Sequence, residues 1–170
     1  MDEIQTGLGR TGTMWACEQH DVVPDILTSA KGLASGLPLG ATLVRDWVAD
    51  GAASHGSTFS GTPVVCAAAG ATLDVLDRED LPHHAAVMGQ YLRDQLTERV
   101  GDDVRDVRGE GLMVGIEVKR GANRLLRDLA LNHQVLALPA GRTVLRLLPP
   151  LVVDEQECDA VVDAIEAVVS

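Results

Sequence analysis

Apolar residues recur at two different spacings along the chain, and the spacing changes near residue 80. Over residues 81–100 the apolar positions follow the period of a helix, which predicts one long amphipathic helix; they are Leu81, Ala85, Met88, Leu92, Leu96 and Val100. A second helical stripe, from Cys158 to Val169, predicts the last helix. Asp154 and Glu157 stand three residues apart before this stripe, which is the spacing of a capping box.

Short apolar runs between these two helices predict strands. The runs lie at residues 104–108, 112–118, 135–138 and 144–148. Glycines at 109 and 111 indicate a hairpin turn between the first two runs, and residues 123–132 have the pattern of a helix. The second half is therefore predicted to be a compact α+β unit, and we expect residues 104–170 to be its independently stable part.

The first half consists of short apolar runs separated by glycine-rich loops. The run that ends at Lys31 predicts a buried strand, residues 41–44 predict another, and residues 45–54 predict a short helix. Residues 64–76 are apolar on nearly every side of a helix, so we expect that helix to be buried. Thr62 is expected to cap it and Pro63 to be its first residue. The change of pattern places a domain boundary between residues 80 and 81.

Composition excludes several classes of partner. The net charge of −11 argues against nucleic-acid binding. No run of eighteen apolar residues is present, so no membrane span is expected, and the start of the chain lacks a secretion signal, which favours the cytoplasm. Cys17, Cys66 and Cys158 are odd in number and far apart, and we expect buried thiols in a reducing compartment, with no metal site.

Lysine is rare, and one lysine stands in a conspicuous place. The chain has only Lys31 and Lys119. Lys31 follows an apolar run and precedes a glycine, which would let a planar group approach the amine. A primary amine forms a Schiff base with an aldehyde, whereas an arginine guanidinium stays protonated and does not. A plain surface lysine at a strand end is the alternative.

Two glycine-rich loops are candidates for phosphate binding. Residues 7–12 match G-x-G-x-x-G, but no strand precedes them and hardly any helix follows, so we reject a dinucleotide site. Residues 55–63 are rich in hydroxyl groups and open directly into the predicted helix, where amides and hydroxyls could hold a phosphate. A capped loop without any ligand is the alternative for this second loop.

Arg146 stands alone between apolar neighbours on a predicted strand. A guanidinium in such surroundings needs a partner, which is either an internal carboxylate or an acidic ligand. His83 and His84 begin a polar stretch of the long helix, and we expect both to be solvated.

Five segments in order resemble the class III pyridoxal-phosphate-dependent aminotransferases. They are residues 2–12, 24–33, 55–59, 108–115 and 145–151. Within that family, the sequence is most similar to acetylornithine aminotransferases and to relatives that act on acetyl-lysine or on lysine precursors bound to the LysW carrier. The resemblance implies an α/β fold, namely the C-terminal portion of a fold-type I transferase that depends on pyridoxal phosphate. Residues 1–80 would be part of the cofactor-binding large domain and residues 81–170 the small domain.

The resemblance also implies cofactor-binding roles. Lys31 would hold pyridoxal phosphate as a Schiff base and later move the substrate proton. Asp2 would bond the pyridine nitrogen, which makes the ring an electron sink. Gln5 would approach the phenolic oxygen of the ring, and Ile4 would pack on a ring face.

The remaining implied roles concern the phosphate and the substrate. Ser57 and Thr58 would bind the cofactor phosphate, in this family from the neighbouring subunit of a homodimer. Arg146 would clamp the substrate α-carboxylate. Residues 59–63 read Phe-Ser-Gly-Thr-Pro where relatives carry Gly-Gly-Asn-Pro, which puts Ser60 near the phosphate.

The implied activity is transfer of an amino group from an N-acetylated or carrier-linked diamino acid to 2-oxoglutarate, in arginine or lysine biosynthesis. The N-terminal half of the family is missing, so we expect the chain alone to be inactive. A non-catalytic fragment remains an alternative. So does another class III enzyme: an ornithine or 4-aminobutyrate aminotransferase, or an aminomutase.

Overall fold

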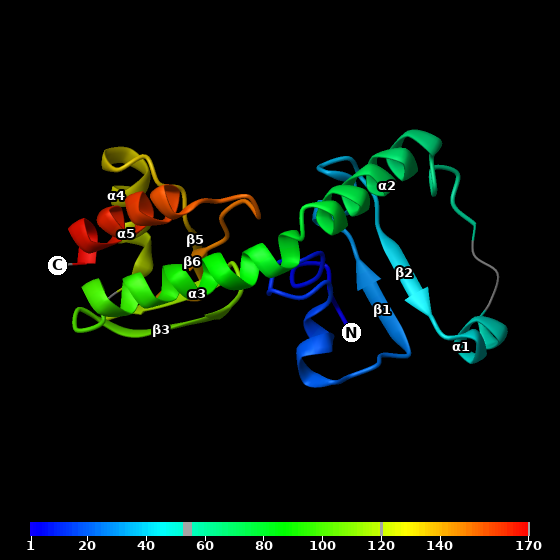
Figure 1. Ribbon diagram of the computed structural model, residues 1–170, viewed down its shortest axis with the longest axis horizontal. Helices are drawn as coiled ribbons and strands as arrows, with labels where there is room; N and C mark the ends of the chain where they lie inside the picture. Colours follow the sequence, from blue (N-terminus) through cyan, green and yellow to red (C-terminus); the bar gives the residue numbers. More distant parts are fainter. Residues whose placement is uncertain (53–55, 120, 170) are drawn as a thin grey trace. The chain divides into compact units, whose positions relative to one another are not determined.

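The computed structural model describes residues 1–52, 56–119 and 121–169, and it has a mixed α/β architecture (Figure 1). The chain forms two compact units, Met1–His83 and His84–Ser170. The boundary between them lies within helix α3 (Leu81–Val100), which begins at the end of the first unit and continues into the second.

The second unit is built on a four-stranded antiparallel sheet with the order β3-β4-β6-β5. The strands are β3 (Val104–Glu110), β4 (Met113–Val118), β5 (Leu138–Ala140) and β6 (Val144–Leu147). Helix α4 (Ala122–Asn132) connects β4 to β5, and helix α5 (Glu155–Val169) follows β6.

One face of this sheet carries the core. Alternate residues of the central strands are buried, as the period of a strand requires; they are Val114, Ile116 and Val118 on β4, and Leu145 and Leu147 on β6. The predicted stripes of the two long helices pack on them, and Leu92, Leu96, Val162 and Ile165 are at most 1% exposed. The two amphipathic helices predicted from spacing are therefore confirmed.

Helix α3 touches the β3–β4 turn at a position where no side chain fits. A Cβ atom added to Gly89 would lie 1.9 Å from the carbonyl oxygen of Gly111. Gly111 itself has a φ of +49°, which a side chain rarely adopts, and it opens the two-residue turn with Leu112. The glycines on both sides let helix and turn meet backbone to backbone.

Several sequence predictions for the second unit need correction. The strand expected at 135–138 is β5 at Leu138–Ala140, because only those residues pair with β6. Val135 and Ala137 pack against the core, while Leu136 between them is 89% exposed, and this alternation imitates a strand. The hairpin turn lies at Gly111 and Leu112, since β3 continues through Glu110.

Two further corrections concern helix α3. His84 is not simply solvated, because its Nε2 lies 2.8 Å from the carbonyl oxygen of Val153. Residues 104–170 are not the compact unit by themselves, since α3 supplies Leu92, Leu96 and Val100 to the core. The capping box before α5 is confirmed: the Glu157 amide donates to Asp154 Oδ1 at 2.8 Å, and Glu157 Oε2 accepts from the Asp154 amide at 3.1 Å.

The first unit has a two-stranded antiparallel sheet of β1 (Ile26–Ser29) and β2 (Ala41–Val44). The short 3₁₀ helix η1 (Ala16–His20) precedes β1, and a second, η2 (Lys31–Ala34), follows it. Helices α1 (Asp46–Gly51) and α2 (Pro63–Arg78) complete the unit.

The expected burial of the helix at 64–76 is wrong for this chain. In α2 only Ala69 and Leu76 are buried, while Val64 is 68% exposed. The partners of α2 in this unit are few, mainly η2, where the hydroxyls of Ser35 and Thr72 lie 2.9 Å apart. An apolar helix with so little packed against it is typical of a surface that other structure covers.

The three cysteines differ in environment. Cys17 and Cys158 are buried as expected, but Cys66 on α2 is exposed, which corrects the prediction for that residue. Burial raises the pKa of the Cys158 thiol to about 11, with smaller contributions from nearby carboxylates such as Asp159. Burial and the Glu3 carboxylate also raise the pKa of Cys17.

These environments predict the order of thiol labelling. The thiolate is the reactive form, so a raised pKa lowers the reactive fraction at about pH 8. We expect Cys66 to react with a thiol reagent in the folded chain, and Cys158 to react at least about 100-fold more slowly until denaturant is added. The control is Cys66→Ser, which should remove the fast phase. Rapid labelling of Cys158 in the folded chain would contradict the described core.

None of the described helices combines the length and the apolar character needed to span a bilayer.

Candidate functional site

Lys31 lies at the junction between β1 and η2, directly after the strand. The strand ends at Ser29 and not at Lys31, so Lys31 opens the 3₁₀ helix. Its side chain is exposed and its φ is +49°, in the left-handed region that lysine seldom adopts. Uncommon backbone conformations of this kind concentrate at functional sites, where the surrounding structure holds them.

Residues 1–3 run beside β1 and bring Asp2 to the same strand. The Thr28 amide donates to the Met1 carbonyl at 3.0 Å, and the Glu3 amide donates to the Thr28 carbonyl at 2.9 Å. Asp2 thereby forms a parallel bridge with Thr28. The carboxylate at position 2 and the amine at position 31 therefore belong to neighbouring segments. Lys31 follows the bridged residue Thr28 by three positions.

A turn follows Asp2 and holds the next two candidate residues. Asp2 Oδ1 accepts a hydrogen bond of 3.0 Å from the Ile4 amide, which fixes the direction of the carboxylate. Ile4 and Gln5 are half-buried in this turn. The structure thus gathers Asp2, Ile4, Gln5 and the segment leading to Lys31 within one part of the first unit.

Glu3 is a member of this arrangement that sequence reasoning missed. It is 1% exposed, and its carboxylate accepts hydrogen bonds from the Cys17 amide, at 2.9 Å, and from the Thr6 hydroxyl. Periodicity gives no signal for it, because a glutamate in a polar stretch normally lies in solvent. Its place between Asp2 and Ile4 in a motif was the only available hint.

The glycine-rich loop at 7–12 shapes the backbone and leads into no α-helix. A Cβ on Gly7 would lie 2.6 Å from the Trp15 ring, and Gly9 and Gly12 have φ values of +87° and +100°. The next helix, η1, is a 3₁₀ helix of five residues. A dinucleotide fingerprint needs a longer helix after its glycines.

Ser57 and Thr58 lie exposed in the loop before α2. Their motif neighbour His55 lies outside the described residues. Pro63 is the first residue of α2, as predicted, and Thr62 holds the N-cap position. The Thr62 hydroxyl donates to the Phe59 carbonyl at 2.9 Å and makes no hydrogen bond to the helix, so its expected capping role is wrong.

Arg146 belongs to the second unit, on the central strand β6. Leu145 and Leu147 point into the core, so Arg146 points to the opposite face of the sheet. Its direct partner on β4 is Gly115, which has no side chain, and its partner on β5 is Leu138. Directly opposite Arg146 on β4 there is therefore no side chain, although a Cβ atom added to Gly115 would lie 3.3 Å from Val144 Cγ1.

Two carboxylates on the neighbouring strands β3 and β4 are paired with arginines. Glu117 lies two residues along β4 from Gly115, and its Oε2 accepts a hydrogen bond of 2.9 Å from Arg108. The same Arg108 also binds Asp106 at 2.7 Å. Arg108 therefore binds the carboxylates of Asp106 and Glu117, and Glu117 also lies 3.8 Å from Arg105.

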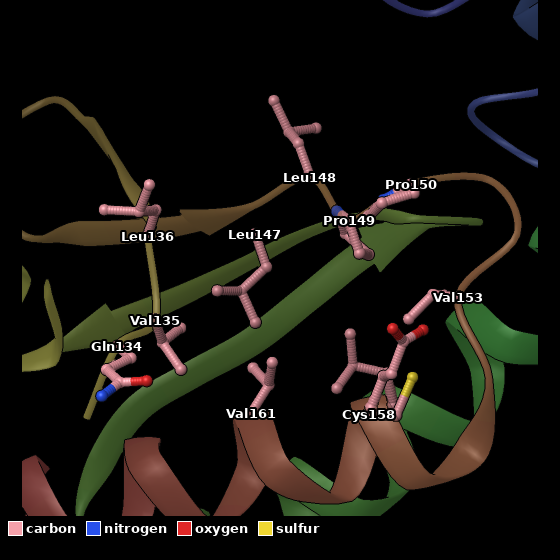
Figure 2. A pocket seen from close by; sticks show the side chains of 12 residues that line it. Gln134, Val135, Leu136, Leu147, Leu148, Pro149, Pro150, Val153, Cys158 and Val161 are labelled. Atoms are coloured by element: carbon pink, nitrogen blue, oxygen red, sulfur yellow. The ribbon is translucent and has the colours of Figure 1, made fainter.

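An apolar pocket of about 290 Å³ lies on the other face of β6 (Figure 2). Leu147 and Val161 line it from β6 and α5, and Glu157 is its one charged lining residue. Because Leu147 and Arg146 point to opposite faces, this pocket is separate from Arg146. Its apolar lining does not suit a carboxylate substrate.

The residues of the first unit fit pyridoxal phosphate chemically. A carboxylate, an amide side chain and a primary amine on adjacent segments match the cofactor's ring nitrogen, phenolic oxygen and aldehyde. In addition, the Ser29 hydroxyl is 2% exposed and has no hydrogen-bond partner among the described residues, two positions before Lys31. The described histidine, cysteine and carboxylate side chains form no cluster that could hold a metal ion.

The family model and similar curated proteins all point to the same protein family. The Aminotransferase class-III family matches residues 1–169. The acetylornithine aminotransferase of Methanosarcina mazei is 42% identical over 165 residues, covering 97% of this chain and 42% of that protein. The LysW-aminoadipate semialdehyde transaminase of Deinococcus radiodurans is 41% identical over 172 residues, covering 100% of this chain and 40% of that protein.

Solved structures agree with the sequence matches. The ornithine aminotransferase of Toxoplasma gondii superposes with a TM-score of 0.92 at 35% identity, covering 99% of this chain and 42% of that one. A second structure of that enzyme records partial occupancy of PLP at its active site. Pyridoxal phosphate is thus the cofactor that the comparisons indicate, and the fold is that of the C-terminal portion of such a transferase. The chain spans only about two-fifths of the length of the relatives it matches.

Proposed function

Because the chain belongs to the class III aminotransferases, we propose that it supplies the lysine half of a pyridoxal-phosphate site for amino-group transfer. The observation that carries this proposal is the bridge between Asp2 and Thr28, which sets a carboxylate beside the strand that delivers Lys31. When bound, the cofactor supplies an electron sink for the substrate carbanion.

Each candidate residue has a proposed task. Asp2 keeps the pyridine nitrogen protonated, Gln5 bonds the phenolic oxygen, and Ile4 packs on a ring face. Lys31 holds the aldehyde carbon and then moves the proton at the substrate α-carbon. Ser57 and Thr58 bind the phosphate, as contributions to a neighbouring subunit in a homodimer. Their exposed positions in this chain are compatible with such a role.

We propose an N-acetylated or carrier-linked diamino acid as amino donor and 2-oxoglutarate as acceptor, in arginine or lysine biosynthesis. This proposal is supported by two relatives, an acetylornithine aminotransferase and a LysW-aminoadipate semialdehyde transaminase, which are 42% and 41% identical to this chain. Arg146 is proposed to bind the α-carboxylate on the face of β6 opposite the core. We further propose that residues 1–80 are part of a large domain, that residues 81–170 form the small domain, and that the enzyme works in the cytoplasm.

The chain is proposed to be inactive alone, because the relatives are more than twice as long and α2 has an uncovered apolar surface. The test is complementation. The chain is assayed alone and mixed with the separately expressed part of the Methanosarcina mazei enzyme that it does not match. Amino transfer from N-acetylornithine to 2-oxoglutarate in the mixture only would support the proposal. Activity of the chain alone would contradict the proposal that it is inactive by itself. A mixture that binds the cofactor but does not transfer amino groups would favour a non-catalytic fragment.

Replacement of Arg146 tests the substrate role. In the complemented enzyme, Arg146→Lys keeps a positive charge but loses the bidentate geometry. We expect KM for the amino acid to rise on the order of 10–100-fold, the range for loss of a charge-assisted pair worth 1.5–3 kcal/mol. Arg105→Lys, at an exposed arginine on β3, is the control and should leave KM unchanged. An unchanged KM in Arg146→Lys would contradict the assignment.

A further inference from the structure

Glu3 has surroundings that a surface carboxylate does not have. Among the described residues it is the one charged side chain that is fully buried, at 1% exposure. A buried carboxylate is expensive unless its oxygens accept hydrogen bonds. Glu3 meets this condition: one oxygen accepts from the Cys17 amide at 2.9 Å, and the other accepts from the Thr6 hydroxyl.

The backbone of Glu3 is also engaged on both sides. Its amide donates to the Thr28 carbonyl at 2.9 Å, which joins it to β1. Its carbonyl accepts from the Gly7 amide at 3.1 Å, which closes the turn that contains Ile4 and Gln5. One residue thus connects three segments: strand β1, the turn at 4–7 and the start of η1.

This connection bears on the two residues that flank Glu3. Asp2 precedes it, and the direction of the Asp2 carboxylate depends on the Ile4 amide, 3.0 Å away. Because Glu3 holds the backbone on both sides of Ile4, a shift of Glu3 would move the Ile4 amide and with it the Asp2 carboxylate. Gln5 lies in the same turn.

We propose that Glu3 is a positioning residue that locks the segment 2–7 onto β1 and η1, and thereby directs the Asp2 carboxylate toward the cofactor held at Lys31. The part that concerns the cofactor rests on the proposed function. The locking of the segment stands on the hydrogen bonds alone.

Two substitutions of Glu3 separate the effect of its hydrogen bonds from the effect of its negative charge. Glu3→Gln has the same shape, and its amide oxygen accepts from Cys17 while its NH₂ group donates to the Thr6 hydroxyl. Glu3→Ala removes both contacts and leaves the Cys17 amide without its partner. Glu18→Ala is the matched control, because Glu18 is an exposed glutamate on η1 whose carboxylate accepts from the Trp15 amide at 3.3 Å.

The experiment measures two quantities in the full chain. Amide hydrogen exchange of residues 2–19 reports the locking of the segment without cofactor, and α5 serves as the internal reference for folding. Titration with pyridoxal phosphate, followed by borohydride reduction and peptide mapping, reports cofactor capture at Lys31. We expect Glu3→Ala to speed exchange and weaken capture about tenfold or more, and Glu3→Gln and Glu18→Ala to stay within about threefold of the original chain.

The outcomes test the locking of segment 2–7 and the directing of the Asp2 carboxylate separately. Unchanged exchange in Glu3→Ala would overturn the locking. If Glu3→Gln is as impaired as Glu3→Ala, the charge and not the position matters, and the proposal is overturned. If exchange responds but capture at Lys31 does not, the segment is locked without effect on the cofactor, which overturns the directing role. If the original chain captures no cofactor at Lys31, the proposed function fails together with the directing role, while exchange still decides the locking.

Discussion

Gly89→Ala is expected to destabilise the second unit by about 2–3 kcal/mol, the typical result of forcing extra atoms into a closely packed contact. The added Cβ would lie 1.9 Å from the Gly111 carbonyl oxygen, which is backbone and cannot move as a flexible side chain can. The intrinsic gain of alanine over glycine in a helix, about 1 kcal/mol, offsets only part of this loss. Urea unfolding followed by circular dichroism measures the change.

The control is another glycine in the middle of a helix. A Cβ atom added to Gly70 on α2 would meet no described atom outside its own helix backbone within 4 Å. Gly70→Ala should therefore leave the free energy of unfolding unchanged or raise it by up to about 1 kcal/mol. A Gly89→Ala chain as stable as Gly70→Ala would mean that α3 does not press on the β3–β4 turn as described.

Lys31→Arg is expected to abolish covalent capture of pyridoxal phosphate. Arginine keeps the charge and fits the same exposed position, but its guanidinium does not form a Schiff base. We expect the apparent affinity for the cofactor to fall on the order of 100-fold, equivalent to about 2.7 kcal/mol. Absorbance titration and retention of cofactor after gel filtration are the measurements.

The control for this substitution is the other lysine. Lys119 is exposed after β4, and its Nζ donates to the Asp102 carbonyl at 2.6 Å, so Lys119→Arg should leave cofactor binding unchanged. Equal loss in both variants, or loss in neither, would mean that capture is not specific to Lys31.

The sequence predicted the second unit well because the residues that form its core pack against one another within the same unit. The stripe from Leu81 to Val100 and the alternation on β4 follow directly from burial against neighbouring elements. The strand at 135–138 was misplaced because Val135 and Ala137 alternate with an exposed Leu136 without pairing to β6. Hydrogen-bond register, which decides strand identity, leaves no mark on hydrophobicity.

The first unit was less predictable for a different reason. The apolar character of α2 predicts a buried helix, but among the described residues little packs against it, and only Ala69 and Leu76 of this helix are buried. Glu3 and His84 were missed because a polar residue held by hydrogen bonds to backbone groups has the same sequence signal as a solvated one. Motif positions, and not periodicity, pointed to Asp2 and Lys31.

The most direct test of the central claim is the site of the covalent label in the original chain. Pyridoxal phosphate is added, the adduct is reduced with borohydride, and peptides are mapped by mass spectrometry. We expect the label to be concentrated on Lys31, since its amine follows the strand with which Asp2 forms a bridge. A label spread equally over Lys31, Lys119 and the amino terminus would contradict it.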